Sequence, residues 1–367
     1  MNILDAALRN WAMAAATQPL SRRVPGETAA QYLDDVGYRK PGRRTAWRSF
    51  LLAFSGQSRF KQDRFPPGAK RLLWIYFGET QIGDALMDLA PRSLLSELGC
   101  EVDLYTDASI AALFEDDPWF RRVSSEEAGF KGGPYDCAIV LSNKARPLAP
   151  KRLGFARLPW VSLHEYFTGP NFHRGLFAAQ RLADLAGVHL GEAQLDRHSR
   201  QKLGPLPQSE KVERNSRSLV TLAVGGVHQN RTYAGWEEVL GKLVSVGYKR
   251  FALVGNANGR EQAAALVHSL AGVAQVDDFT AILTLTQTRA ILEASSVVAC
   301  PDGGLMHLAL TTRAAIVALF SAEIAPEWRL PYRNTSTALR SHTSSVSDIA
   351  PDKVAATILQ LLQATEL

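Results

Sequence analysis

The stretch VVACPDGGLMHLA, residues 297–309, decides the expected fold. It opens with four apolar residues, as in a parallel strand that is buried on both faces. Asp302, Gly303 and Gly304 then interrupt the apolar run, and helical periodicity begins directly after them. A buried strand that turns straight into a helix is the repeating unit of a parallel α/β sheet, and ligands of such sheets bind where the strands end.

The same rhythm extends over most of the chain. The apolar runs RLLWIYFG (71–78), SLVTLAVGG (218–226) and AIVALFS (315–321) alternate with segments of helical periodicity, one of which runs unbroken through 85–99. WVSLHEYF (160–167) is interpreted as a further strand, and the charged stretch around 190–217 shows neither pattern. We therefore expect two successive doubly wound α/β domains that face a central cleft.

The boundaries follow from these patterns. They predict a basic N-terminal extension (1–69) with some helix near 45–55, an N-terminal Rossmann-like domain (70–195), a linker (196–217), a C-terminal Rossmann-like domain (218–345) and a closing helix (346–367).

Composition excludes several classes of protein. Hydrophobic residues make up 46% and charged residues 21% of the chain, which is typical of a globular protein. Cys100, Cys137 and Cys300 lie far apart, so neither a disulfide nor a zinc site is expected. No segment has the apolar length of a membrane span, and Asp5 and Arg9 interrupt any signal-peptide pattern, so the expected location is the cytoplasm.

Positive charge is concentrated in the N-terminal region. Residues 1–72 contain 13 Lys and Arg against 5 Asp and Glu, whereas the remainder contains 28 against 31. This balance suits an anionic partner, such as lipid head groups or nucleic acid, and equally suits a solvated arm. A helical stripe of Leu4, Leu8, Trp11 and Ala15 fits either a membrane interface or contact with the protein itself.

Polar loops follow several of the expected strands. At 302–307, glycines at the start of a helix would let a phosphate approach the backbone, and His307 lies one turn inside that helix. The alternative is that Asp302 only caps the helix, the glycines only form a turn and His307 is simply buried.

Two further loops raise the same choice. After the strand at 218–226, Gly225 and Gly226 lead to Arg231, which suits a phosphate or is merely solvated, and Asn256 ends the next strand, FALVGN. Neither G-K-[ST] nor G-x-G-x-x-G is present there, which argues against a P-loop NTPase or a dinucleotide dehydrogenase. Asp84 in the loop 77–89 is either a general base facing the cleft or a helix cap. No motif calls for a metal.

Taken together, these stretches resemble glycosyltransferase family 9, the ADP-heptose:lipopolysaccharide heptosyltransferases and their relatives. The run 276–328, which contains DGGLMHLA, is similar to the family's C-terminal signature of a strand followed by D-[ST]-G-x-x-H-[LA]-A. LLWIYFGETQIGD (72–84) is similar to the family's first strand and G-D loop, and IAPDKVAATILQLL (349–362) to its last helix.

The resemblance implies a GT-B fold in which the second Rossmann-like domain holds most of the nucleotide sugar. It implies an inverting, metal-independent transfer of heptose or a related sugar, ADP-linked in the family, to a hydroxyl of a glycan or glycolipid such as lipopolysaccharide core, with no cofactor and no nucleic acid. Asp84 would deprotonate the acceptor, and the donor would contact eight residues: Gly225, Gly226, Arg231, Asn256, Asp302, Gly303, Gly304 and His307. A location peripheral to the inner membrane, through the basic N-terminus, would suit a glycolipid acceptor.

Three features depart from the family pattern. Gly303 stands where the family has Ser or Thr, and Ala234-Gly235 precede Trp236 where a lysine is usual, so that Arg231 would substitute for it. The family also begins close to its first strand and lacks the N-terminal extension. Two alternatives stay open: a sugar-nucleotide epimerase of the same fold, which would form product without an acceptor, and a catalytically silent module that binds a membrane or an assembly.

Overall fold

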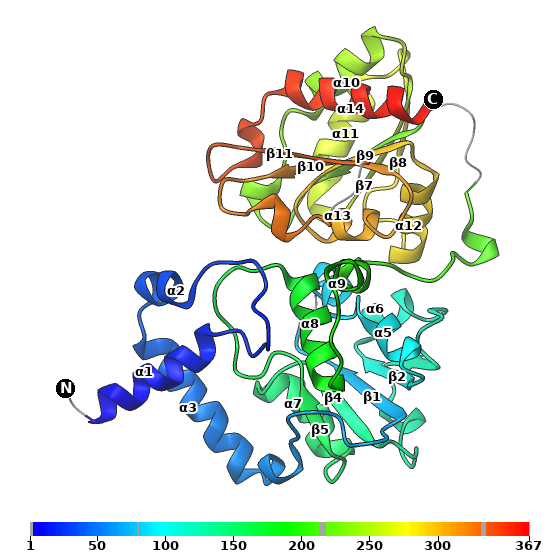
Figure 1. Cartoon of the computed structure of the whole chain (residues 1–367). Coiled ribbons are helices and arrows are strands. Elements are labelled where there is room, and N and C mark those ends of the chain that lie inside the picture. The colour runs from blue at the N-terminus through cyan, green and yellow to red at the C-terminus, as the bar shows by residue number, and fades with distance from the viewer. Residues whose placement is uncertain (1–2, 80, 213–217, 332–334, 367) are drawn as a thin grey trace. The chain divides into compact units, whose positions relative to one another are not determined.

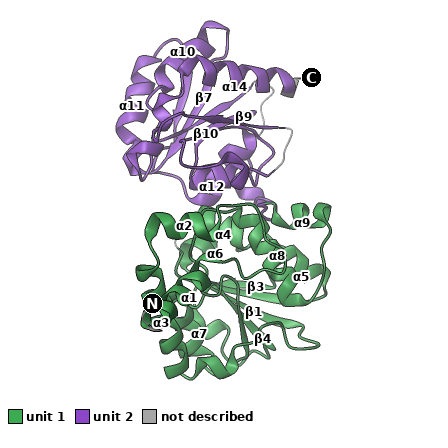
Figure 2. Cartoon of the chain, turned by 60° about the vertical axis from the view of Figure 1, so that its left-hand side comes forward, with its two compact units in different colours: residues 1–200 green, residues 201–367 purple. Residues whose placement is uncertain are grey.

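A computed structural model describes residues 3–79, 81–212, 218–331 and 335–366, and the chain divides into two compact units (Figures 1 and 2). Unit 1 comprises residues 1–200 and unit 2 comprises residues 201–367. Each unit contains one parallel sheet flanked by helices. The predicted α/β class with two Rossmann-like sheets is therefore confirmed.

The sheet of unit 1 has the strand order β3-β2-β1-β4-β5. Its strands are β1 (Arg71–Tyr76), β2 (Glu101–Thr106), β3 (Arg122–Ser124), β4 (Cys137–Val140) and β5 (Trp160–Ser162). The chain enters the sheet at its central strand, β1, where Leu72 lies opposite both Val102 of β2 and Cys137 of β4. The next two strands, β2 and β3, are added on one side of β1, and β4 and β5 are then added on the other side. The strand order therefore reverses between β1 and β4. Loops at such a reversal leave room for a ligand at the carboxyl ends of the strands.

Helices cover both faces of this sheet because β1 is apolar on both. Leu73 and Ile75 share a core with Leu52 and Leu148, which lie on two helices of one face. Trp74 points the other way and meets Phe120 edge-on at 6.5 Å between ring centroids. The helices of unit 1 are α1 (Ile3–Ala16), α2 (Ala29–Val36), α3 (Arg39–Phe54), α4 (Ile82–Asp88), α5 (Arg92–Glu97), α6 (Ala108–Leu113), α7 (Ala145–Gly154), α8 (Arg174–Ala186) and α9 (Glu192–Ser199).

The N-terminal segment is part of unit 1 and is not a solvated arm. Helices α1 and α3 cross so closely that a Cβ on Gly42 would lie 2.3 Å from the carbonyl oxygen of Leu8. The Ala15 carbonyl accepts a hydrogen bond from the backbone of Thr168 at 2.9 Å, which ties α1 to the loop after β5. Of the apolar stripe on α1, Ala15 is buried and Trp11 contacts Tyr166, whereas Leu4 is exposed. In the part of the chain that the structure describes, no helix is both long and apolar enough to cross a membrane.

The sheet of unit 2 has the strand order β11-β10-β9-β6-β7-β8, and the reversal lies between β6 and β9. Its strands are β6 (Val220–Val224), β7 (Arg250–Gly255), β8 (Gln275–Asp278), β9 (Val297–Pro301), β10 (Ala315–Phe320) and β11 (Ser336–Arg340). Its helices are α10 (Trp236–Ser245), α11 (Arg260–Ser269), α12 (Leu285–Ala294), α13 (Gly304–Ala309) and α14 (Pro351–Glu366). The closing helix α14 contributes Val354, Ile358 and Leu362 to the core of this unit.

Several sequence-based boundaries were wrong. The helix predicted over 85–99 is two helices, since Pro91 stands immediately before α5 and ends the pattern. The strand predicted over 160–167 stops at Ser162, and Glu165 adopts a left-handed backbone conformation with φ of 52°. Helix α9 extends into the predicted linker, and it was missed because Leu195 is its only large apolar residue. Strands β8 and β11 were also missed.

Candidate functional site

In unit 1, the polar groups gather where the strand order reverses. Glu79 in the loop after β1 and Lys144 in the loop after β4 form an ion pair at 3.3 Å. This pair spans the gap between the ends of the two strands, and Asp84 lies on α4, which the β1 loop leads into. The side chains therefore lie at the position where sheets of this kind bind ligands.

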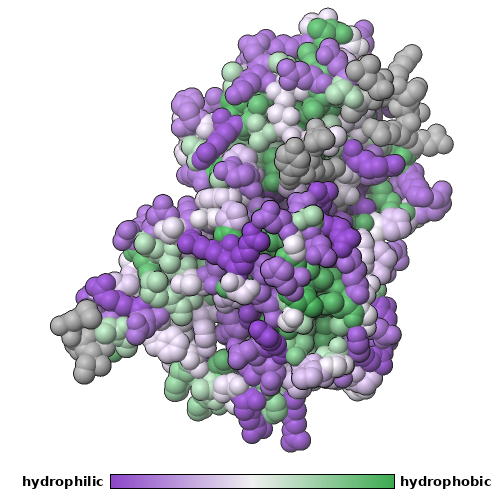
Figure 3. Space-filling view, viewed as in Figure 1, coloured by the Kyte–Doolittle hydropathy of each residue, from purple (hydrophilic) through white to green (hydrophobic). Residues whose placement is uncertain are grey.

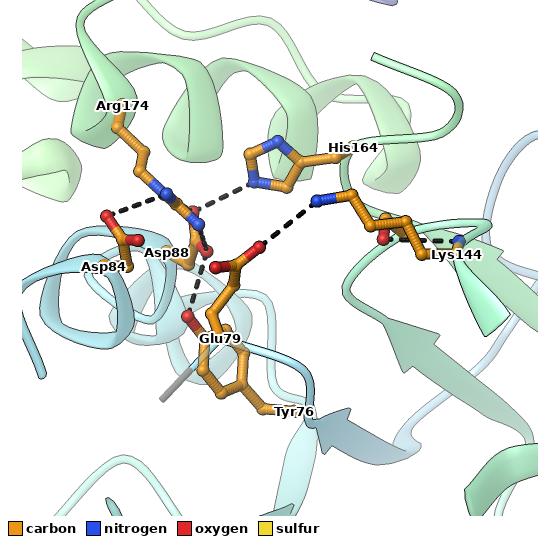
Figure 4. A network of polar contacts seen from close by, with 8 residues as sticks. Tyr76, Glu79, Asp84, Asp88, Lys144, His164 and Arg174 are labelled. Carbon is orange, nitrogen blue, oxygen red and sulfur yellow. Dashed lines mark hydrogen bonds and ion pairs between the residues drawn. The ribbon is translucent and has the colours of Figure 1, made fainter. Parts of the chain in front are cut away.

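Arg174, the first residue of α8, joins two carboxylates of α4. Its guanidinium lies 2.8 Å from Asp84 Oδ1 and 2.6 Å from Asp88 Oδ2, and its Nε donates to Asp88 Oδ1 at 2.8 Å (Figure 4). Asp84 and Asp88 are four residues apart and so share one face of the helix. His164 and Tyr76 complete the network through contacts with Asp88 at 3.0 and 3.1 Å.

The network fixes the ionisation of its buried members. Burial opposes the charge on Asp88, but Arg174 and His164 outweigh it and hold the pKa of this carboxyl well below its usual range. Burial and the neighbouring charge of Asp88 raise the pKa of the Tyr76 hydroxyl well above its usual value. Asp88 is therefore ionised and Tyr76 neutral at physiological pH.

Accessibility separates the two carboxylates. The side chain of Asp88 is 0% exposed, whereas that of Asp84 is 20% exposed. A group that takes a proton from a substrate must come within hydrogen-bonding distance of it. Only Asp84 of this pair meets that condition, and Arg174 sets its orientation.

In unit 2, the corresponding reversal lies between β6 and β9 and brings together the other predicted residues. Asp302 follows β9, and its carboxylate is 3.5 Å from the guanidinium of Arg231 in the loop after β6. Burial raises the pKa of Asp302, and the positive charges of Arg329 and Arg231 partly offset that effect. A nearly buried carboxylate that is paired with Arg231 thus marks the carboxyl edge of this sheet.

The glycines of this edge have different roles. Gly225 has a φ of 69°, and a Cβ there would lie 2.4 Å from the backbone nitrogen of Gly259 in the loop after β7. The carbonyl of Gly226 accepts a hydrogen bond from the Asn258 side chain at 3.1 Å, and Asn256 caps the same loop. Gly225 is therefore required by a close approach of two loops, independently of any ligand.

The loop after β9 is less constrained. Gly303 has an extended φ of 166°, and a Cβ on it would meet only the Pro301 carbonyl oxygen, at 4.0 Å. Gly304 begins α13, which has six residues, so its macrodipole is small and a phosphate there would depend mainly on free N–H groups. His307 is buried, and its Nδ1 lies 2.9 Å from the Gln201 side-chain oxygen.

Sequence reasoning missed seven residues of these two clusters: Tyr76, Glu79, Asp88, Lys144, His164, Arg174 and Arg329. Asp88 lies one helical turn after Asp84, so helical spacing was a usable signal for it. Arg174, Lys144 and Arg329 reach their clusters only through the tertiary fold, and no local motif marks them.

Comparison with known proteins gives the family. The family model described as glycosyltransferase family 9 (heptosyltransferase) matches residues 169–356, just over half of the chain. The chain belongs to this family, and the resemblance found in the sequence is confirmed. A comparison with curated proteins finds no match.

Solved structures of the same family have the same fold. A glycosyl transferase family 9 protein from Veillonella parvula has a TM-score of 0.64 at 14% identity, over 82% of this chain and 99% of that one. The ADP-heptose lps heptosyltransferase II of E. coli has a TM-score of 0.62 at 18% identity, over 81% and 100%. The E. coli heptosyltransferase WaaC, solved with ADP, has a TM-score of 0.60 at 14% identity, over 79% and 99%.

Proposed function

We propose that the protein transfers heptose or a related sugar from an ADP-linked donor to a hydroxyl of a glycan or glycolipid such as lipopolysaccharide core, with inversion and without a metal or other cofactor. Membership of the family supports transferase activity. The observation that carries the mechanism is the Asp84–Arg174–Asp88 arrangement, which offers one accessible, oriented carboxylate. Inverting transfer needs one such base, whereas a retaining double displacement needs a nucleophile as well.

Asp84 acts as the base in this proposal. Its carboxylate accepts the proton of the acceptor hydroxyl while that oxygen attacks the anomeric carbon and the bond to the diphosphate breaks. The Arg174 guanidinium orients Asp84, and Asp88 shares the positive charge so that Arg174 does not fully neutralise Asp84.

Negative charge develops on the departing diphosphate. In the proposal, the backbone N–H groups of Gly303 and Gly304 and the guanidinium of Arg231 receive it, and the sugar lies near Asp302 and His307. Arg231 substitutes for the lysine that the family places before its tryptophan. One oriented donor of this kind contributes about 3 kcal/mol to stabilisation of a transition state.

Replacing Asp84 tests the base. Asp84→Asn should abolish transfer and leave the affinity for ADP within about twofold, since the isosteric amide cannot accept the proton. Asp116→Asn removes an exposed carboxylate of the same unit and should change neither quantity. Transfer by Asp84→Asn at the wild-type rate would exclude Asp84 as the base.

Three assays test the remaining claims. The anomeric configuration of the product reports inversion, and activity after dialysis against EDTA reports metal independence. Incubation with the sugar nucleotide alone should give no isomerised sugar, because the reaction needs an acceptor. An altered sugar nucleotide in that incubation would indicate an epimerase instead.

A further inference from the structure

Helix α3 presents three aromatic side chains to the outside of unit 1. Trp47, Phe50 and Phe54 are 60%, 54% and 82% exposed. Their spacing places them on one stripe of the helix, and their rings stack in sequence, with centroids 5.5 and 5.9 Å apart. A contiguous exposed aromatic stripe marks an interaction surface, because its solvation is unfavourable in an isolated protein.

A basic pocket adjoins this stripe on the same helix. Lys40, Arg44 and Arg48 follow one another at four-residue intervals and line a pocket of about 230 Å³, together with Tyr32, Lys144 and Thr168. Burial and the nearby charge of Arg44 lower the pKa of Arg48. Among the ion pairs of the described residues, none includes Lys40, Arg44 or Arg48. Positive charges that lie this close together favour the binding of an anion in the pocket.

The rest of unit 1 holds this surface in a fixed orientation. The opposite face of α3 is buried through Pro41, Gly42, Thr45 and Leu52. The whole helix contains five cationic residues and no acidic one: Arg39, Lys40, Arg43, Arg44 and Arg48. Figure 3 shows hydrophobic and hydrophilic surface side by side in this part of unit 1.

We propose that α3 docks the protein on a bilayer that contains anionic phospholipid. Trp47, Phe50 and Phe54 enter the interfacial region, and head-group phosphates lie at Lys40, Arg44 and Arg48. Aromatic side chains favour the membrane interface, and basic residues near it favour anionic lipid. The docking is separate from sugar transfer, so its failure would leave the proposed activity standing.

Two other partners fit this surface less well. Single-stranded nucleic acid stacks its bases on free aromatic faces, but the rings of α3 stack on one another at interplanar angles of 23° and 18°. A second copy of the chain that paired through α3 would bring two sets of the same cations together. A bilayer satisfies the aromatic and the basic groups at once.

Vesicle flotation of the full-length protein tests the docking. Wild type should bind vesicles that contain phosphatidylglycerol, should bind pure phosphatidylcholine far more weakly, and should dissociate as salt rises. Lys40→Gln/Arg44→Gln should weaken binding about 25-fold, since each charge contributes about fivefold near an anionic surface. Phe50→Ser/Phe54→Ser should lose most of the vesicle binding that wild type retains at high salt.

Matched variants in unit 2 provide the controls. Lys249→Gln/Lys353→Gln removes two exposed cations, and Val246→Ser/Ile282→Ser removes two exposed apolar side chains. Both should bind vesicles like wild type, and transfer to a water-soluble acceptor should be equal in all variants. Equal binding by the α3 and control variants, or no binding by wild type, would overturn the proposal. So would a wild-type dimer that the α3 variants convert to monomer without any effect of lipid.

Discussion

At the scale of single residues, Asp84 and Asp88 share one face of α4 but differ in burial. Asp88 is buried and engages Tyr76, His164 and Arg174, so its task is to hold Arg174 in place. Asp84 shares Arg174 but remains partly exposed. Burial accounts for the difference between the two carboxylates, since both residues carry the same chemical group.

Removing the buried carboxylate should make the protein markedly less stable. Asp88→Asn leaves the charge of Arg174 undercompensated, and we expect a loss of about 3–5 kcal/mol in the free energy of unfolding at pH 7. The folded-state pKa of Asp88 is depressed, so its contribution is present above the unfolded-state value near 4 and is lost as the pH falls through that value and below it.

Urea denaturation at several pH values measures this effect. The difference between wild type and Asp88→Asn should shrink steadily as the pH falls from about 5 towards 3. Asp116→Asn, at an exposed position, should follow wild type throughout. A difference that stays constant with pH would mean that the carboxylate charge is not what stabilises the fold.

The glycine at the end of β6 offers a second test. Gly225→Ala combines a positive φ with a clash at 2.4 Å against Gly259, so a loss of about 1–3 kcal/mol in stability is expected. Gly241→Ala, on an exposed part of α10 with nothing within 4 Å of the new Cβ, should instead gain about 0.5–1 kcal/mol. The midpoints of thermal unfolding of the two variants test this expectation. Equal midpoints would contradict the steric argument.

At the scale of elements, strands were easier to predict than helix ends. β1, β6, β9 and β10 are continuous apolar runs, so their burial on both faces was visible in the sequence. β8 and β11 were not visible, because they lie at or near the edges of the sheet and their burial is partial. α9 is stabilised through contacts with α5 and α8 and carries little periodicity of its own.

The crossing of α1 and α3 gives a prediction at this scale. Gly42→Ala places a methyl group 2.3 Å from the Leu8 carbonyl oxygen, so the helices must separate, at a cost of about 1–3 kcal/mol. Limited proteolysis should then cleave α1 sooner than in wild type. Arg43→Ala, at the neighbouring exposed position, serves as the control, and the same cleavage rate in both variants would show that the crossing tolerates a side chain.

At the scale of the whole molecule, the sequence predicted the class of fold, the family and the edges of the sheets where polar residues gather. Asp302 and Arg231, 71 positions apart, were both singled out, and the structure brings them into contact. The residues that hold Asp84 and Asp88 could not be predicted, because Arg174 on α8 and His164 after β5 reach them only through the tertiary fold. Roles in catalysis and donor binding remain predictions.

The two units should respond differently to nucleotide. Each has its own core, and the residues that we propose to bind the donor all lie in unit 2, so ADP should protect unit 2. At about a hundred times its dissociation constant, ADP should stabilise by about 2.7 kcal/mol. Hydrogen exchange followed by mass spectrometry should show slower exchange within 218–331 and little change within 3–79, while UDP and GDP serve as comparisons. Protection confined to residues 3–200 would mean that the nucleotide binds unit 1 and would contradict the prediction.

The strand order of unit 2 also affects how the protein is made. β6 lies in the middle of its sheet, and its neighbour β9 follows much later, since Val220 pairs with Val297. A ribosome that adds about 5–20 residues per second leaves one edge of β6 uncovered for about 4–15 s. An uncovered apolar edge invites pairing with other nascent chains. Yield in a heterologous host should therefore depend on elongation speed and on chaperones that cover this edge until β9 has emerged.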